Sequence, residues 1–208
     1  SVHKAVARQI YVDNTISDAG NGVFFWCGGI ESIAARNEIV RAATVNVNSI
    51  WGGGLLPAIK LQFNDNVISE GLNYGASYIH LRGGMIGAIS YPPVYAQYPG
   101  EVPGRPEGWR TDARAPDYRA AMTMLQTIRG NTILNNGRYY VGGLVSDCVL
   151  EHNTVNDADT GIEITRNGGR WEDWFEGGPT GILVRGNVMR NVERPLTGDR
   201  LDEAVVME

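Results

Sequence analysis

Cysteine and lysine are scarce in this sequence. Its 208 residues contain only two cysteines, Cys27 and Cys148, and only two lysines, Lys4 and Lys60. Two cysteines cannot make the framework of a disulfide-rich scaffold, and we expect both to be buried thiols. The formal net charge of −5 disfavours binding to the phosphate backbone of nucleic acids, so we expect no nucleic-acid partner.

Long apolar runs and the short motifs of several enzyme classes are also missing. The sequence has no run of about 18 apolar residues that could cross a membrane, and residues 1–25 lack the pattern of a signal peptide. It holds no Cys/His cluster for zinc, no phosphate-binding glycine loop and no G-x-S-x-G motif. We therefore expect no membrane contact, no metal ligands of this kind and no required cofactor.

Glycine, in contrast, is abundant. The chain has 27 glycines, and 43 % of its residues are apolar. Short runs such as "IYV", "IKLQF" and "GILVRGNVM" are rich in residues that favour strands and are separated by Gly, Asn and Asp. This pattern predicts a turn-rich all-β protein that is long enough to bury the core of one domain.

An asparagine recurs along the chain, each time with an apolar residue two positions later and an uncharged residue three positions earlier. The six anchors are Asn14, Asn37, Asn66, Asn131, Asn153 and Asn187. Helical repeats would show apolar residues every three or four positions, and these units do not. The units predict coils of three short strands, each coil hydrogen-bonded to the next. In such a stack a buried asparagine can bond its counterparts above and below, which satisfies polar groups that would otherwise lack partners.

The "I-x-x-N-T-I" and "N-x-[IV]…G-[IV]-x-[IV]" units resemble the coils of right-handed parallel β-helix proteins, the pectate-lyase-like superfamily, from about residue 8 to 208. The resemblance implies a single β-helix domain over residues 1–208, with about six to eight coils and an internal Asn ladder. It implies little about activity, because this fold hosts lyases, glycoside hydrolases, epimerases, esterases, tailspikes and adhesins.

Two stretches interrupt the repeat. Residues 91–119 hold six of the nine prolines, which cannot serve a central strand because proline lacks the backbone donor. Residues 167–179 lengthen the gap before Asn187. We expect both stretches to be loop insertions that leave the coil, the first of them rich in proline and tyrosine.

The ends of the sequence show no helix or loop that would cover a terminal coil, and "LDEAVVME" is predicted to be a strand. Open strand edges invite association with other chains. We therefore expect the chain to be part of a longer β-helix, with missing N- and C-terminal coils or another chain covering the ends.

The strands that begin about eight residues after an anchor form a candidate site. "GVFFW" and "GIEIT" are predicted to lie in one sheet with "SYIHL" between them. If Val23, Ile162 and Ile164 point inward, alternation turns their neighbours outward. In the family that the units resemble, ligands lie along one such sheet, framed by loops. The predicted substrate-binding residues are Phe24, Trp26, Tyr78, His80 and Arg82, with Trp171 and Trp174 from the second insertion; Thr165 also points outward.

Glu163, in the same outward row, is the preferred catalytic carboxylate. Its partner would be Asp159 or Asp157, because glycoside hydrolysis needs two carboxyl groups roughly 5 to 10 Å apart. The earlier copy of the unit has no acid at the places of Glu163 and Asp159, so the repeat does not require these two. Asp157 aligns with Asp18 and could serve the turn alone. The second insertion offers further partners: Glu172, Asp173 and Glu176.

The leading hypothesis is a secreted or cell-surface glycoside hydrolase that acts on a poly- or oligosaccharide. A polysaccharide lyase or uronate epimerase is the nearest alternative, with His80 as base and Arg82 as anion clamp, although the shortage of lysine favours hydrolysis. A third is a non-catalytic glycan-binding or structural β-helix, like a tailspike or adhesin. Calcium could be held by Asp157 and Asp159, and His152 is expected to be structural.

Overall fold

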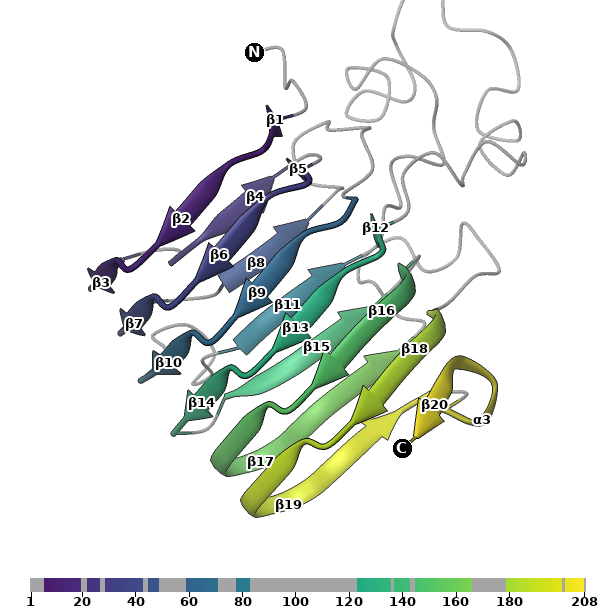
Figure 1. Ribbon diagram of the computed structural model, residues 1–208. Coiled ribbons are helices and arrows are strands. Elements are labelled where there is room, and N and C mark those ends of the chain that lie inside the picture. Colours follow the sequence, from purple (N-terminus) through teal and green to yellow (C-terminus); the bar gives the residue numbers. More distant parts are fainter. Residues whose placement is uncertain are drawn as a thin grey trace, which may run out of the picture.

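The computed structural model describes residues 6–19, 22–26, 29–42, 45–48, 59–70, 78–82, 123–135, 137–142, 145–165, 179–199 and 201–207. Almost all of its elements are short β-strands that stack in parallel along one axis (Figure 1). The predicted insertion at 91–119 lies outside the described residues. So does the one at 167–179, apart from Pro179.

An eight-stranded sheet forms the first face of the stack. Its strands are β2 (Ile10–Val12), β6 (Ile33–Ala35), β9 (Gln62–Asn64), β13 (Thr127–Arg129), β16 (Val145–Glu151), β18 (Thr180–Arg185) and β20 (Val205–Met207), with β12 (Thr123–Met124) beside β16. Two further short strands, β1 (Val6–Ala7) and β5 (Gly29–Ile30), pair with each other near its N-terminal end.

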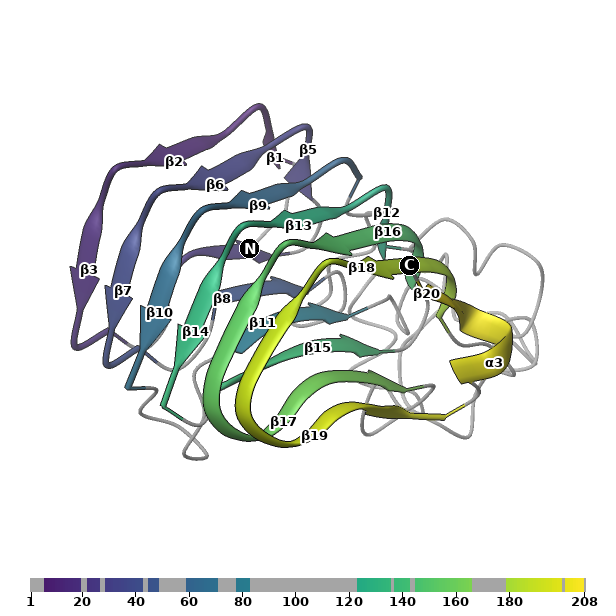
Figure 2. The same cartoon turned by 60° about the horizontal axis from the view of Figure 1, so that its bottom comes forward.

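A ten-stranded sheet bends around a corner and forms the second and third faces (Figure 2). The second face contains β3 (Thr15–Ser17), β7 (Glu38–Val40), β10 (Val67–Ser69) and β14 (Thr132–Leu134). The third contains β4 (Phe24–Trp26), β8 (Val45–Asn48), β11 (Tyr78–Arg82) and β15 (Arg138–Gly142). The long strands β17 (Thr154–Thr165) and β19 (Val188–Gly198) pass through the corner and belong to both faces.

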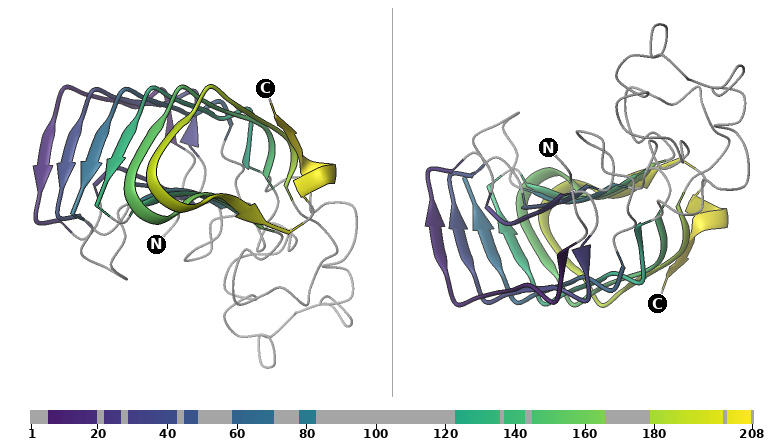
Figure 3. Two further views of the ribbon diagram at one scale, coloured as in Figure 1. Left: turned by 90° about the horizontal axis from the view of Figure 1, so that it is seen from below. Right: turned by 90° about the horizontal axis from the view of Figure 1, so that it is seen from above.

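This all-β stack of parallel strands agrees with the parallel β-helix that the sequence predicts. Two details differ. β17 and β19 run through the corner without a break, so these coils are not divided into three separate strands. The segment that was predicted to be one terminal strand begins with a helical turn, α3 (Leu201–Ala204), before β20. This turn lies beside β20 and carries the chain from the third face to the first (Figure 3).

The six anchor asparagines form the predicted ladder. From each rung to the next, Nδ2 donates to the following Oδ1 over 2.8 to 3.1 Å, and the backbone N–H donates to the same oxygen. In every rung after the first, Nδ2 also donates to a backbone carbonyl of the preceding coil. The asparagines from Asn37 to Asn153 are buried, and each uses both the donor and the acceptor side of its amide.

Apolar rows fill the interior beside the ladder. One row is Ile16, Ile39, Ile68, Ile133, Val155 and Met189, and a second is Tyr11, Ala34, Phe63, Ile128, Leu150 and Val184, as the parallel register shows. The ring of Phe25 packs edge-on between Tyr11 and Phe63, with ring centroids 5.7 Å apart in each pair. These are the uncharged positions on either side of each anchor.

Cys148 is buried as a free thiol, as predicted, and burial raises its pKa to about 12. Cys27 lies outside the described residues. Of the residues that the structure describes, none belongs to a helix with the length and apolar character that a membrane crossing requires.

Three columns of left-handed residues run along the corners of the stack. Their φ angles lie near +50 to +66° at the positions six before, one before and four after each anchor. The columns are Arg8, Glu31, Lys60, Leu125, Asp147 and Gly181; Asp13, Arg36, Asp65, Gly130, His152 and Gly186; and Asp18, Arg41, Glu70, Asn135, Asp157 and Asn191. His152 is therefore a corner residue, in keeping with the structural role expected for it.

Charges alternate down the first three rungs of each column. Arg36 binds Asp13 through two hydrogen bonds of 2.7 Å, and Arg41 binds Asp18 through two of 2.6 and 2.8 Å. These hydrogen bonds hold the pKa of Asp13 and that of Asp18 below the usual value. Because all four side chains are exposed, the pairs contribute modestly to the free energy of unfolding.

Removal of one internal rung should destabilise the fold far more than removal of the terminal one. Asn131→Ala leaves the backbone N–H and Nδ2 of Asn66 and the carbonyl of Phe63 without their partner, which should cost about 2 to 4 kcal/mol. Asn14→Ala, the matched control, leaves no buried donor without a partner. It should reduce the free energy of unfolding by less than about 1.5 kcal/mol. Urea unfolding measures both; equal losses would contradict the dependence on the ladder.

Candidate functional site on the third face

The strand register aligns six residue positions of the third face in one row. The row contains Phe24, Asn46, His80, Tyr140, Glu163 and Thr197. β11 lies between β4 and β17, which is the place predicted for "SYIHL". A second row, two residues further along, contains Trp26, Asn48, Arg82, Gly142 and Thr165. We call the outer side of these strands the candidate face.

The inward and outward assignment is confirmed where side chains are described. Val23, Ile162 and Ile164 are buried, and Glu163 between the last two keeps 27 % of its side chain exposed. For β8 and β11, and for β4 apart from the buried Phe25, the described structure is the backbone alone, so the side chains of Phe24, Trp26, Tyr78, His80 and Arg82 lie outside it. Trp171 and Trp174, and the acids of the second insertion, also lie outside the described residues.

Glu163 lies beside an arginine and an aromatic ring on the candidate face. Arg138 Nε is 3.1 Å from Glu163 Oε2, an ion-pair distance. The guanidinium carbon of Arg138 lies 6.0 Å from the centre of the Tyr140 ring, close enough for a cation–π contact. Both partners come from β15, the strand next to Glu163. Together the three side chains make a polar and aromatic group at the centre of the face.

Gly142 makes room for the ring of Tyr140. A Cβ at Gly142 would lie 2.6 Å from one carbon of that ring and 2.7 Å from its hydroxyl oxygen. The ring therefore leans along β15 over the backbone of Gly142, two residues further along the strand. A tyrosine lying along an exposed sheet is a surface on which a flat apolar side of a ligand can pack.

Asp199 is fixed at the C-terminal end of the same face. Its backbone N–H donates to the carbonyl of Ile164 over 3.0 Å, and its Oδ2 accepts a 2.8 Å hydrogen bond from Thr165 Oγ1. Gly198, with φ of +148°, permits this approach, because a Cβ there would overlap the Ile164 carbonyl oxygen. Thr165 is on the outward side as predicted, but it is buried, whereas Asp199 is exposed.

The other two predicted acids lie further back along β17. Asp157 has φ of +56° in a corner column, and its Oδ1 accepts a 2.9 Å hydrogen bond from Asn191 Nδ2. This is the turn geometry that its alignment with Asp18 indicated. Asp159 is exposed and stands four residues before Glu163, which corresponds to roughly 13 Å of extended strand.

A comparison with protein-family models, with curated proteins and with solved structures finds no match to this chain. Within the described ranges, no three histidine, cysteine, aspartate or glutamate side chains form a group that could hold a metal ion. The calcium hypothesis for Asp157 and Asp159 stays a prediction.

The sequence reasoning missed three residues of this face: Arg138, Tyr140 and Asp199. A signal was present for Asp199 alone, which follows Asn187 by twelve residues, as Thr165 follows Asn153. Tyr140 follows Asn131 by nine residues, whereas Glu163 follows Asn153 by ten. Applied from Asn131, the offset of ten would have selected the buried Val141.

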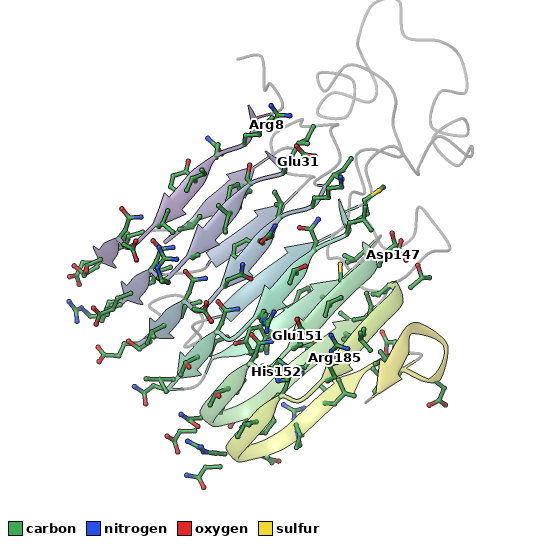
Figure 4. The ribbon with its side chains drawn as sticks, in the orientation of Figure 1. Arg8, Glu31, Asp147, Glu151, His152 and Arg185 are labelled. Atoms are coloured by element: carbon green, nitrogen blue, oxygen red, sulfur yellow. The ribbon has the colours of Figure 1, made fainter. Side chains whose placement is uncertain are left out.

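A second charged group, on the first face, contains Glu151 and Arg185 (Figure 4). Glu151, with only 10 % of its side chain exposed, accepts 2.6 and 2.8 Å contacts from Arg185, and Arg129 lies 3.7 Å away. Hydrogen bonds from Arg185 hold the pKa of Glu151 below its usual value, and the charge of Arg129 acts in the same direction. The carboxylate is occupied by its arginines, so this group is a stabilising ion cluster.

Arg185→Met should lower the stability at neutral pH and make the stability less dependent on acid. A glutamate with a lowered pKa in the folded state stabilises the fold above its unfolded pKa, and this contribution is lost as pH falls through the folded value. Without Arg185 the pKa of Glu151 should rise toward its unfolded value, so the variant should be less stable than the wild type at pH 7, and the difference between them should shrink as pH falls. Urea midpoints between pH 3 and 7 measure this, with exposed Arg190→Met as control. Identical acid profiles for the two variants would contradict the assignment.

Gly142→Ala should destabilise the protein by about 1 to 3 kcal/mol, because the added methyl group collides with the Tyr140 ring. The penalty should largely disappear in a Tyr140→Ala background, since the obstructing ring is then gone. A double-mutant cycle by urea unfolding measures the coupling between the two sites. An equal penalty in both backgrounds would show that the ring does not lie over Gly142.

Proposed function

We propose that this protein is a carbohydrate-active β-helix of the right-handed, pectate-lyase-like kind, and that it hydrolyses a poly- or oligosaccharide bound along the candidate face. The observation that carries the proposal is the placement of Glu163. This partly exposed carboxylate stands on the outer side of a parallel sheet, 3.1 Å from Arg138, in a row with Tyr140 and with the backbone positions of His80 and Phe24.

The shape of the face supports an extended ligand. Six strands at about 4.8 Å spacing give a row roughly 24 Å long, enough for several sugar units. Aromatic residues stand at Phe24 and Tyr140 in one row and at Trp26 in the next. Rings of this type pack against the apolar sides of sugars, while neighbouring polar groups bond the hydroxyls. Such substrates imply action outside the cell, by secretion or at the cell surface.

Hydrolysis requires that one carboxyl group protonate the departing oxygen while another activates water or attacks the sugar. Glu163 is assigned one of these roles, and its position does not serve the fold, because the matching place in other coils holds Phe24, Asn46 or Tyr140. Asp159 is the less favourable partner, since it precedes Glu163 by four residues, a path of up to roughly 13 Å along β17.

A lyase or epimerase is the second candidate. Its support is Arg138 beside Glu163 and the positions of His80 and Arg82 on β11, which adjoins β15. An arginine and an imidazole could neutralise an acidic sugar and remove a proton next to its carboxylate. Products distinguish the two reactions, because only a lyase forms an unsaturated sugar that absorbs ultraviolet light.

Glu163→Gln should lower turnover of the best substrate in a polysaccharide panel by roughly 10²- to 10⁴-fold, since the amide can neither donate nor accept the transferred proton. The matched control is Asp157→Asn, an acid-to-amide change on the same strand at a corner position that asparagine tolerates. It should keep near-normal turnover, and both variants should unfold at the wild-type temperature. Unchanged turnover in Glu163→Gln would refute the role of this residue.

A further inference from the structure

We infer that Asp199 is the second carboxylate of the site and acts together with Glu163. The inference rests on the proposed function and supplies what that proposal lacks, a partner acid at workable distance. Asp199 belongs to the last described coil, just after β19, and its carboxylate lies over Thr165 on the candidate face. It is the exposed acid that the register brings closest to Glu163 among the described residues of this face.

The register fixes how far apart the two acids stand. Thr165 follows Glu163 by two residues on β17, which is roughly 6.6 Å along the strand, and Asp199 sits opposite Thr165 one strand further on, at roughly 4.8 Å. The two Cα atoms are therefore roughly 8 Å apart. Glu163 leans back toward Arg138, so its carboxylate and that of Asp199 are separated by roughly 8 to 10 Å.

Asp199 is held in place by hydrogen bonds of both its backbone and its side chain. Its backbone N–H is bonded to Ile164, its side chain to Thr165, and Gly198 supplies the one backbone conformation that lets it fold over the end of β17. The Thr165 hydroxyl occupies only Oδ2, and the exposed residue can present Oδ1 to a ligand. A carboxylate anchored through backbone and side chain is pre-organised for proton transfer.

The lower part of this range suits an inverting hydrolysis, in which carboxyl groups stand roughly 6.5 to 9.5 Å apart to admit a water molecule. One carboxyl group gives its proton to the glycosidic oxygen as the bond from that oxygen to the anomeric carbon breaks. The other carboxylate takes a proton from water, whose oxygen forms the new bond to the anomeric carbon from the opposite side. The products are a free alcohol end and a hemiacetal of inverted configuration, and the two acids have exchanged protonation states.

The test compares Asp199→Asn and Glu163→Gln with Asp202→Asn, an exposed acid three residues further along in α3, in the full chain. On the best polysaccharide of the panel, Asp199→Asn should lose roughly 10²- to 10⁴-fold in kcat with an unchanged unfolding temperature. Asp202→Asn should keep wild-type kcat. Proton NMR of the first product formed by the wild-type protein should show the inverted anomer.

A second variant separates chemistry from folding. Thr165→Val keeps the Asp199 carboxylate but removes the hydroxyl that holds it, so kcat should fall less, by roughly 3- to 30-fold, while KM stays near the wild-type value. An Asp199→Asn enzyme with wild-type kcat, beside an inactive Glu163→Gln, would overturn this inference alone. A product of retained configuration would overturn it too. No turnover of any glycan by the wild-type protein would instead refute the proposed function.

Discussion

The asparagine ladder sets the register of the strands that the structure describes. In each internal rung the amide oxygen accepts hydrogen bonds from two donors of the preceding coil. The amide nitrogen donates to the asparagine of the following coil and to a backbone carbonyl of the preceding one. A buried amide with an unmade bond is expensive, so the rungs can stack in one register only. The third face inherits that register, and it is the reason that residues from distant parts of the chain stand in straight rows.

The ladder and the inward rows could be predicted because they impose the same residue type in every coil. Asn at the anchor and an apolar residue two positions on recur six times, a signal that survives insertions. The corner columns left no such signal, since a left-handed φ is shared by Arg8, Glu31 and Lys60, which are not typical of that conformation. The four residues of α3 are too few to show a helical period.

The candidate site was predicted in part, for a reason that lies in the same repetition. Glu163 stands out because other coils hold no acid at its place, whereas Asp157 repeats Asp18 and proves to occupy a corner. Arg138 and Tyr140 could not be ranked from the chain alone, because their importance comes from lying one strand away from Glu163, in a pairing that only the register reveals. Residues that stabilise the coils recur at the same place in every repeat. Candidates for function are the residues that differ from the repeat at such a place.

The alternating charges at the corners have a consequence for assembly of the coils. If the first coil stacked on the third and left out the second, Arg8 would face Lys60, Asp13 would face Asp65, and Asp18 would face Glu70. All three corners would then set like charges one strand spacing apart, while the correct order sets opposite charges there. Both orders would set an asparagine beside an asparagine and an apolar residue beside an apolar residue. In the first three coils the corner charges therefore favour the observed order, which the ladder, identical at every rung, does not specify.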